Sequence, residues 1–418
     1  MMNKTVSEVV KSGLCTSCGV CKVACAKKCI QFKYGQEKNV PYIDESICTE
    51  CGLCYSVCPG KGLPLNFISD SLWKETEGVC HNKYCGYALS AYTGYSQDED
   101  IRFHSASGGV VSQFLIYLLE KGIVDGAIVV RFNIDNPLEP EPFIATTKDE
   151  ILNSRGSKYV VLSYDKVLEQ ALAFDGKLVV VGMPCQIQGL RLLCSKKKTL
   201  SEKIIGFFSI YCSLNKTKHS IDYYLYHYKI ERDKIGKFAF RDDGCLGYMK
   251  IADKKGDVIK KVKYESYWHG THNFFANGRC ALCIDHFGEL ADISFGDIHV
   301  DPYKQDTIGV NSMITRSRFW DNHLKECACN GYILLKAESL DVVVSSQPYS
   351  KIYKKGAGIV CNFKMRSLIG KKNPDYDTPH YSKPRLKNYI SEISKAWMRH
   401  IGHHRSLWFI VHFLDKSK

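Results

Sequence analysis

The chain has 418 residues, 45% of them hydrophobic and 24% charged, and its formal net charge is +13. A single hydrophobic core usually stops growing near about 250–300 residues, so this length predicts two or three domains, and the composition excludes general disorder. No apolar run reaches the roughly 18–20 residues of a membrane-spanning helix, and the positive charge taken alone indicates nucleic acid or anionic lipid as a partner.

The N-terminal segment and the cysteines indicate a compartment. Residues Met1 to Lys11 are polar and lack the apolar stretch of a secretory signal. We therefore expect a cytoplasmic protein whose 20 cysteines are metal ligands or redox groups and do not form a disulfide framework. Nine of these 20 cysteines lie between Cys15 and Cys58, which makes this segment the first to interpret.

Two runs in this segment, 15–25 and 48–58, follow the spacing C-x2-C-x2-C-x3-C. This pattern is typical of bacterial ferredoxins with two [4Fe-4S] clusters, in which the fourth cysteine of each run ligates the other cluster. Zinc, the alternative, would use four cysteines in two separated pairs. The spacing assigns one cluster to Cys15, Cys18, Cys21 and Cys58, and the other to Cys48, Cys51, Cys54 and Cys25.

The rest of the segment is compatible with a small module over residues 1–75. Gly19 and Gly52 follow the second cysteine of each run and let the backbone pass close to a cluster. Ala26 replaces the proline of the pattern, which shapes only the exit turn, and Cys29 is expected to be a small buried residue. Short alternating apolar stretches at 30–32 and 40–43 predict strands, so the module is expected to be an α+β ferredoxin-like fold.

The middle of the chain predicts an α/β domain. A helix is expected over 110–119, closed by Gly122, followed by strands at 127–130 and 159–162 and a helix that ends near Phe174. The continuous apolar run 177–182 is typical of a buried parallel strand and leads into a further helix. This alternation predicts a mixed, mostly parallel sheet with ligands at the carboxyl ends of its strands.

Two loops in this domain have ligand-binding chemistry. The turn from His104 to Gly109 opens a helix, where hydroxyls and glycines can accept phosphate oxygens, although an ordinary serine N-cap explains it as well. Cys185 lies at a strand end and helix start, where a thiolate is favoured, and a buried structural cysteine is the alternative.

Four motifs then occur in one order: Ser105-Ala-Ser-Gly-Gly-Val110, Arg155-Gly-Ser-Lys-Tyr159, Gly182-Met-Pro-Cys-Gln-Ile187, and Cys280-Ala-Leu-Cys283 followed by Ala291-Asp-Ile-Ser-Phe-Gly-Asp297. Behind a two-cluster ferredoxin, they resemble the coenzyme F420 hydrogenase/dehydrogenase beta subunit family over roughly residues 15–344. Members of that family are iron–sulfur flavoproteins that relay electrons between FAD, a further [4Fe-4S] cluster and a substrate, which is the deazaflavin coenzyme in the founding members.

The resemblance implies a flavin and iron–sulfur domain over 76–345. It implies that the turn from Ser105 to Gly109 holds the flavin pyrophosphate and that Lys158 contacts a phosphate or the flavin edge, with an ordinary surface lysine as the alternative. The residues it assigns to FAD are Ser105, Ser107, Gly108, Gly109, Ser157, Lys158 and Tyr159. Asp297, at the end of its strand, lies where ligand-facing residues belong.

A third [4Fe-4S] cluster needs two thiolates besides the pair Cys280 and Cys283. Cys185 and Cys212 both follow apolar strands, and parallel strands would bring them to the same edge of the sheet. We therefore predict a site made of Cys185, Cys212, Cys280 and Cys283. The alternatives are Cys80 and Cys85 as the second pair, or a zinc site that uses Cys327 and Cys329.

The C-terminal residues 346–418 are expected to be a basic linker and an amphipathic helix. Residues 371–418 contain ten Lys and Arg against four Asp and Glu, with prolines early and aromatic residues late. Such a helix lies on an anionic membrane surface or docks on the body or on a partner subunit.

The leading hypothesis is a cytoplasmic oxidoreductase that relays electrons between ferredoxin-type clusters, FAD and a small molecule, with ferredoxin or another redox protein as partner. An electron-transfer subunit without its own substrate site and a metal-binding protein that contacts nucleic acid are the alternatives. Three clusters of about −2 each, together with FAD, would offset much of the +13 charge, so we expect no nucleic acid partner. The sequence specifies neither the substrate, the use of coenzyme F420, the direction of electron flow nor the oligomeric state.

Overall fold

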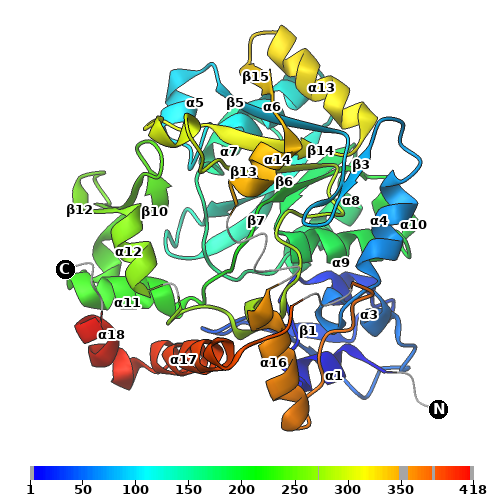
Figure 1. Cartoon of the computed structure of the whole chain (residues 1–418), viewed down its shortest axis with the longest axis vertical. Coiled ribbons are helices and arrows are strands. Elements are labelled where there is room, and N and C mark those ends of the chain that lie inside the picture. The colour runs from blue at the N-terminus through cyan, green and yellow to red at the C-terminus, as the bar shows by residue number, and fades with distance from the viewer. Residues whose placement is uncertain (1–3, 272, 348–355, 379–381, 415–418) are drawn as a thin grey trace.

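The computed structural model describes residues 4–271, 273–347, 356–378 and 382–414 (Figure 1). Within them the largest sheet has eight strands, in the order β15-β5-β14-β13-β9-β8-β6-β7. The neighbours β13, β9, β8 and β6 are parallel, and the pairs outside them are antiparallel. The strands are β5 (Ser90–Ser96), β6 (Gly126–Phe132), β7 (Pro140–Ala145), β8 (Leu178–Gly182), β9 (Ile204–Ile210), β13 (Ile293–Asp297), β14 (Asn311–Thr315) and β15 (Ile333–Ala337).

Side chains of the parallel strands alternate between two hydrophobic cores, one on each face of the sheet. Leu178 and Val180 of β8 point into one core and Val179 into the other, and all three are fully buried. The first core is covered by α8 (Asp165–Ala173) and α9 (Pro184–Cys194), and the second by α6 (Val110–Glu120) and α13 (Arg318–Cys329). Burial on both faces explains the continuous apolar run of β8. The predicted α/β class with a mixed sheet is confirmed.

One predicted strand is wrong. In the segment 159–162 a single isolated bridge joins Val160 to Lys216, and the segment is otherwise an irregular connection. Its apolar side chains are nevertheless buried. Val160 lies in an aromatic core beneath a separate three-stranded sheet, which is described next, and Leu162 lies in the core beneath α8. The apolar pattern therefore reports side-chain packing between two cores and not strand pairing.

A three-stranded antiparallel sheet forms the second layer of the domain and consists of β10 (Ile235–Asp242), β11 (Tyr248–Asp253) and β12 (Val258–Lys263). It shares an aromatic core with α11 (His219–Tyr228) and α12 (Tyr264–Thr271). The remaining elements of this region are β3 (Cys80–Asn82), β4 (Gly86–Ala88), α5 (Glu99–Phe103), α7 (Lys148–Asn153), α10 (Lys198–Ser201), α14 (Leu340–Ser345) and the short helices η2 (Arg232–Lys234), η3 (Gly278–Leu282) and η4 (Tyr303–Gln305).

The N-terminal module has two helix–turn units and one antiparallel strand pair. Its elements are α1 (Val6–Lys11), α2 (Val20–Ala24), β1 (Ile30–Lys33), β2 (Val40–Ile43), α3 (Leu53–Ser56) and η1 (Pro59–Lys61), followed by α4 (Leu65–Trp73). Gly19 and Gly52 begin α2 and α3 with φ of 89° and 76°. A Cβ on Gly19 would lie 2.4 Å from the backbone nitrogen of Asp165, so this glycine also permits close packing on α8.

The C-terminal part docks on both preceding parts. In place of one helix after a linker, its described residues form α16 (Ala357–Leu368), α17 (Leu386–His403) and α18 (Trp408–Leu414), at the lower edge of Figure 1. Trp408 and Val411 are buried in the aromatic core, and the backbone N–H of Asp375 donates to the Lys61 carbonyl at 2.8 Å. None of the helices in the described residues is both long enough and apolar enough to cross a membrane.

Candidate functional site

The four cysteines assigned to the first cluster lie together in the module. Burial, and then the thiolates of Cys18, Cys58 and Cys15, raise the pKa of Cys21, so all four groups are close in space. Each of the four is at most 6% exposed. Buried thiols keep their protons at neutral pH, and a set of buried thiolates needs a bound cationic metal to be stable. This donor set fits an iron–sulfur cluster.

The second set lies nearer the surface. Cys54 is buried, Cys25 and Cys48 are half-buried, and Cys51 is exposed. Burial raises the pKa of Cys54, and Cys51 and Cys25 lie close enough to raise it further. The Sγ atom of Cys29, expected as a small buried residue, lies 3.3 Å from that of Cys25. The module therefore places one cysteine set deep inside the protein and the other toward solvent.

The structure also brings together the four cysteines predicted for a third cluster. Cys185 begins α9, Cys212 follows β9 by two residues, and Cys280 and Cys283 lie in and just after η3. Burial is the largest cause that raises the pKa of Cys212. The charges of Cys280, Cys185 and Cys283 raise this pKa further, so the four cysteines lie close together. The backbone N–H of Asn215 points at the Cys280 sulfur at 3.4 Å, and such contacts tune the potential of a bound cluster.

The alternative cysteines lie elsewhere. Cys80 is exposed in β3, and Cys85 is buried in a separate small core. Cys327 lies in the core between α13 and the sheet, and Cys329 is exposed at the end of that helix. Neither pair is placed beside Cys280 by the described contacts. The geometry therefore favours Cys185 and Cys212 as the partners of Cys280 and Cys283.

Arg279 joins the first and third cysteine sets. It is 5% exposed, and its guanidinium donates to the carbonyls of Leu14 (3.1 Å) and Gly60 (3.3 Å) and to the Tyr376 hydroxyl (2.9 Å). The anionic groups that act on it most are the Tyr376 hydroxyl and the thiols of Cys283 and Cys185, and no carboxylate of the described residues forms an ion pair with it. A buried cation needs a counter-charge, which anionic clusters on either side would supply.

Helix α9 brings these two sets close together. A Cβ on Gly189 would lie 3.3 Å from the sulfur of Cys18 and 3.2 Å from Pro59, so the helix passes Cys18 at van der Waals contact. Cys185 stands one turn earlier on the same helix, and the charge of Cys18 acts on it. The third set is therefore the direct neighbour of the deeper set in the module.

A cavity of about 1080 Å³ opens on the other side of the third set. It lies at the carboxyl ends of β8, β9 and β13, which is where open α/β sheets bind their ligands. Its lining includes Cys212 itself, the turn before α6, the segment 154–159, the β10–β11 turn and α12. This volume is at the upper end of the range for small-molecule sites, which is large enough for a dinucleotide.

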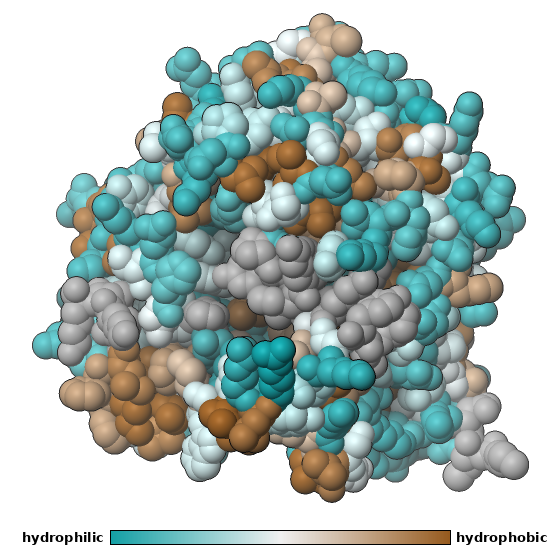
Figure 2. All heavy atoms as spheres, viewed as in Figure 1, coloured by the Kyte–Doolittle hydropathy of each residue, from teal (hydrophilic) through white to brown (hydrophobic). Residues whose placement is uncertain are grey.

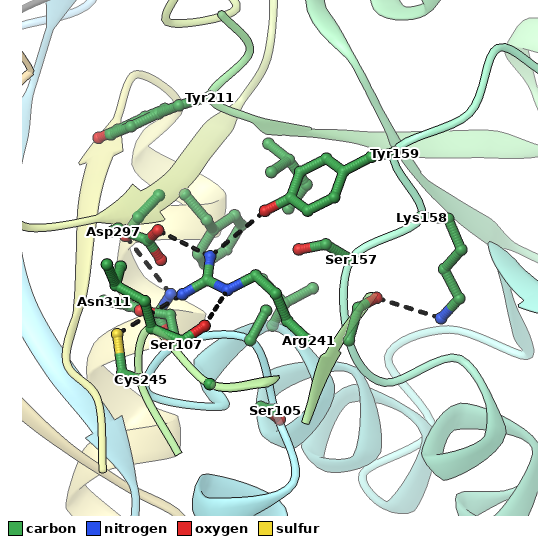
Figure 3. A pocket seen from close by; sticks show the side chains of 18 of the residues that line it. Ser105, Ser107, Ser157, Lys158, Tyr159, Tyr211, Arg241, Cys245, Asp297 and Asn311 are labelled. Carbon is green, nitrogen blue, oxygen red and sulfur yellow. Dashed lines mark hydrogen bonds and ion pairs between the residues drawn. The ribbon is translucent and has the colours of Figure 1, made fainter. Parts of the chain in front are cut away.

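An ion pair between a buried guanidinium and a half-buried carboxylate lies in the cavity (Figure 3). The guanidinium of Arg241, 3% exposed, is 2.8 Å from a carboxylate oxygen of Asp297 and 3.4 Å from the Tyr159 hydroxyl. Burial raises the pKa of Asp297, but the charges of Arg241 and His299 and hydrogen bonds from Arg241 and Ser107 together hold the pKa below its usual value. Asp297 is thus ionised at neutral pH. Sequence reasoning placed Asp297 at the ligand end of the sheet but did not find Arg241 as its partner.

Most residues expected to bind FAD line this cavity, namely Ser105, Ser107, Gly109, Ser157, Lys158 and Tyr159. The Ser105 hydroxyl is buried and has no hydrogen-bond partner within the described residues, so it is available to a ligand. Gly108 does not line the cavity. A Cβ there would lie 2.8 Å from the Asn311 nitrogen and the Gly94 carbonyl, so Gly108 serves the packing of the turn on the sheet.

Lys158 does not point at the cavity centre. Its ammonium donates to the carbonyls of Ser154 (2.6 Å), Arg155 (2.7 Å) and Gly156 (3.1 Å), and Figure 3 shows it directed away from Arg241. Three acceptors occupy all three of its hydrogens, so a contact with a flavin phosphate would require it to give up one of them. Its evident role is to fix the segment that carries Ser157.

His286 is a lining residue that sequence reasoning missed. Burial lowers its pKa to about 4, so the ring is neutral, and its Nδ1 lies 3.0 Å from the Cys212 carbonyl. It follows Cys283 by three residues, but nothing in its local sequence marks it as functional. Arg279 could have been suspected from its place directly before the cysteine pair.

The comparisons with known proteins agree with this arrangement. Residues 14–61 match the family model described as "4Fe-4S dicluster domain". An α/β domain that follows such a module and carries four further grouped cysteines defines the class of the chain as an iron–sulfur protein.

Residues 91–169 and 175–340 match the N-terminal and C-terminal models of "Coenzyme F420 hydrogenase/dehydrogenase, beta subunit". The chain is 31% identical over 221 residues to the coenzyme F420 hydrogenase subunit beta of Methanococcus voltae, covering 51% of this chain and 74% of that protein. The chain belongs to the coenzyme F420 hydrogenase/dehydrogenase beta subunit family, as the motifs predicted.

Two further similarities extend this result. The coenzyme F420-dependent sulfite reductase of Methanocaldococcus jannaschii is 28% identical over 306 residues, which are 70% of this chain and 43% of that protein, so the chain spans less than half of that relative. A chain of the F420-reducing [NiFe] hydrogenase complex from Methanosarcina barkeri has a similar fold, with a TM-score of 0.55 and 21% identity over 72% of this chain and 99% of that chain.

Proposed function

We propose that this chain is an oxidoreductase that relays electrons through three [4Fe-4S] clusters to FAD and a small-molecule substrate. The observation that carries the proposal is the order of the sites. The module set with Cys18 contacts the helix of Cys185, and Cys212 of the same third set lines the large cavity. A continuous series of redox sites from the surface to a substrate cavity is what an electron relay requires.

The chain's own residues support the clusters by donor chemistry. Two sets of four cysteines have the ferredoxin spacing, and a third set of four comes from three separate elements. Arg279 offers a buried positive charge between the first and third sets. A cubane holds its thiolates farther apart than a single zinc ion does. Among the described residues, none of these cysteines belongs to a group of three or more ligand atoms within 4.8 Å of one another, which agrees with the wider spacing of a cluster.

The cavity supports FAD by its shape and its polar groups. The turn before α6 presents the buried Ser105 hydroxyl, and the start of the helix lines the cavity with Gly109, Val111 and Ser112. Backbone N–H groups and the helix dipole at such an end favour a pyrophosphate. When bound, FAD can exchange single electrons with clusters and electron pairs with a substrate. Arg241 and Asp297 would orient the group above them.

A second candidate function is an electron-transfer subunit that supplies a partner enzyme and has no substrate of its own. It is favoured by the names of two relatives. The Methanococcus voltae protein is named as a hydrogenase subunit, and a Methanosarcina mazei protein, 26% identical over 314 residues, is named as one subunit of an F(420)H(2) dehydrogenase. In this case a partner subunit would cover or extend the cavity.

The test is the flavin content and the flavin reduction of the anaerobically purified chain. We expect about one FAD per chain, reduced by a low-potential ferredoxin, as measured by absorbance. Ser105→Phe, which fills the expected pyrophosphate site, should abolish flavin binding, while Ser195→Phe at an exposed helix end should not. Turnover of a small molecule by the isolated chain favours the enzyme, and reduction without turnover favours the subunit. A chain that binds no flavin contradicts both.

A further inference from the structure

The long helix α17 exposes four of its large apolar side chains. Leu386, Ile390, Ile393 and Trp397 are 76%, 61%, 47% and 65% exposed. Their spacing of four, three and four residues places them in one stripe along the helix. We call these four residues the outer stripe.

The opposite side of α17, which faces the body of the protein, is polar around Glu392, and Met398 and Ile401 farther along the helix pack against the aromatic core. Glu392 is buried and accepts from Asn362 (2.8 Å) and Lys395 (2.7 Å), and Arg399 lies close enough to Cys280 for their charges to interact. Gly402 packs on the backbone of Phe274. An amphipathic surface helix of a globular protein normally buries its apolar face. On α17 the outer stripe is a second apolar face, separate from the one that packs on the core, and the fold does not bury it.

Two neighbouring helices expose apolar side chains at the same edge of the molecule. Leu368 and Ile369 at the end of α16 are 84% and 67% exposed, and Phe409 and Phe413 of α18 are 62% and 80% exposed. Figure 1 places α16, α17 and α18 along the lower edge, and Figure 2 shows separate brown patches there with teal between them. The apolar groups are thus separate projections and not one continuous patch.

The exposed charges on this edge have one sign. Between Lys383 and Leu414 there are six Lys and Arg and one acid, Glu392, which is buried and paired. Lys383, Arg385, Lys387 and Arg405 are exposed on the described surface. Apolar side chains interleaved with basic ones are the composition of helices that lie in the interface of anionic membranes.

We propose that the edge formed by α16, α17 and α18 binds the surface of an anionic lipid bilayer, with the outer stripe inserted among the acyl chains. A protein partner would need a shape that matches several separate projections, and the centres of protein interfaces are depleted of charge. A bilayer is deformable and accommodates such projections, while anionic headgroups match the interleaved basic side chains. The proposal does not depend on the electron relay proposed above.

The experiment is co-sedimentation of the full chain with vesicles of phosphatidylcholine alone or mixed with phosphatidylglycerol. We expect binding to the anionic vesicles that weakens as salt is raised. The double variant Ile390→Ser with Trp397→Ser should bind at least about tenfold more weakly, since each loses exposed apolar area that would be buried in lipid. The double variant Ile134→Ser with Phe67→Ser, which removes side chains 74% and 70% exposed elsewhere, should bind as the unmodified chain does.

Other outcomes overturn the proposal. These are no binding of the unmodified chain to anionic vesicles, equal binding to both kinds of vesicle, or equal binding by the two double variants. Light scattering on the same samples measures the oligomeric state. If the unmodified chain is a dimer that does not bind vesicles, and the Ile390→Ser, Trp397→Ser variant is a monomer, the outer stripe binds a second copy of the chain. Because all four substituted side chains are exposed, the iron content of each variant should equal that of the unmodified chain, which verifies folding.

Discussion

Arg279 is the residue whose role follows most directly from its surroundings. Its charge is buried, its guanidinium touches the backbone beside Cys15 and near Cys58, and it directly precedes Cys280. Such a cation stabilises the reduced, more negative form of any cluster bound on either side. It is a positioning and tuning residue, since it donates to backbone carbonyls and does not contact a substrate cavity.

Replacement of Arg279 should therefore lower cluster potentials. A unit charge about 6 Å away at an effective dielectric constant of about 20 contributes roughly 3 kcal/mol, or roughly 100 mV for one electron. We expect Arg279→Gln to lower the midpoint potential of at least one cluster by that order in a redox titration followed by EPR. Arg279→Lys keeps the charge and should restore most of the potential. Equal potentials in Gln and Lys variants would show that the charge is not what matters.

The pair Arg241–Asp297 makes a prediction about stability. Asp297→Asn leaves the buried guanidinium without its carboxylate, which should cost about 3–5 kcal/mol in the free energy of unfolding. Glu202→Gln, which removes an exposed partner of Lys198, should cost at most about 0.5 kcal/mol. Denaturant titration of both variants measures the difference, and equal losses would contradict the importance of the pair.

The same pair gives a pH dependence with a definite sign. Arg241 holds the pKa of Asp297 below its usual value, so the stabilisation is fully present above the unfolded-state pKa of about 4 and is lost as the pH falls through the folded-state pKa. The unmodified chain should lose stability below about pH 4 more steeply than Asp297→Asn does. Thermal unfolding at a series of acid pH values checks this, and parallel curves would contradict it.

At the scale of elements, α9 connects the module to the sheet domain. The absence of a side chain at Gly189 allows Cys18, Val20 and Pro59 to contact the helix. Gly189→Ala requires shifts of a few tenths of an ångström and should be tolerated, because the contacts of its Cβ are 3.2–3.3 Å. Gly189→Val adds two methyl groups beyond the Cβ of alanine at this contact and should separate the helix from the module, at a cost of about 1–3 kcal/mol.

The readout is electron transfer as well as stability. In Gly189→Val the flavin or third cluster should be reduced more slowly by ferredoxin in stopped-flow measurements, while the ferredoxin-type clusters are still reduced at the normal rate. Gly189→Ala serves as the matched control. Equal rates in both variants would mean that electrons do not cross at this contact.

The elements differ in how far the sequence predicted them. The cysteine spacing is local, so the module's ligand sets could be assigned before the structure was known, and the apolar runs of β8 and β9 marked the sheet. Cys212 was predicted as a ligand because parallel strands end at one edge, and the structure places it beside Cys185, Cys280 and Cys283. The strand expected at 159–162 was wrong because two cores, and not a ladder, bury it. The exposure of the outer stripe of α17 and the carbonyl contacts of Lys158 depend on tertiary packing, which periodicity does not encode.

At the scale of the whole molecule, the charges, the cysteine sets and the cavity form one arrangement. The module, α9, the third cysteine set and the cavity follow one another through the protein, and the C-terminal helices cover the side of the third set where Arg399 acts on Cys280. Three clusters of about −2 each would offset roughly six of the +13 charges. Much of the remaining positive charge lies in the C-terminal residues, on the edge proposed to meet anionic lipid.

The central claim is that the third cysteine set holds a cluster between the module and the cavity. Its most direct test is the iron and sulfide content of anaerobically purified chains with single Cys→Ser changes. The unmodified chain should contain about twelve iron atoms, and Cys212→Ser should contain about eight. Cys194→Ser, which alters a half-buried cysteine of α9 outside the set, should retain about twelve. About eight iron atoms in all three chains would contradict the claim.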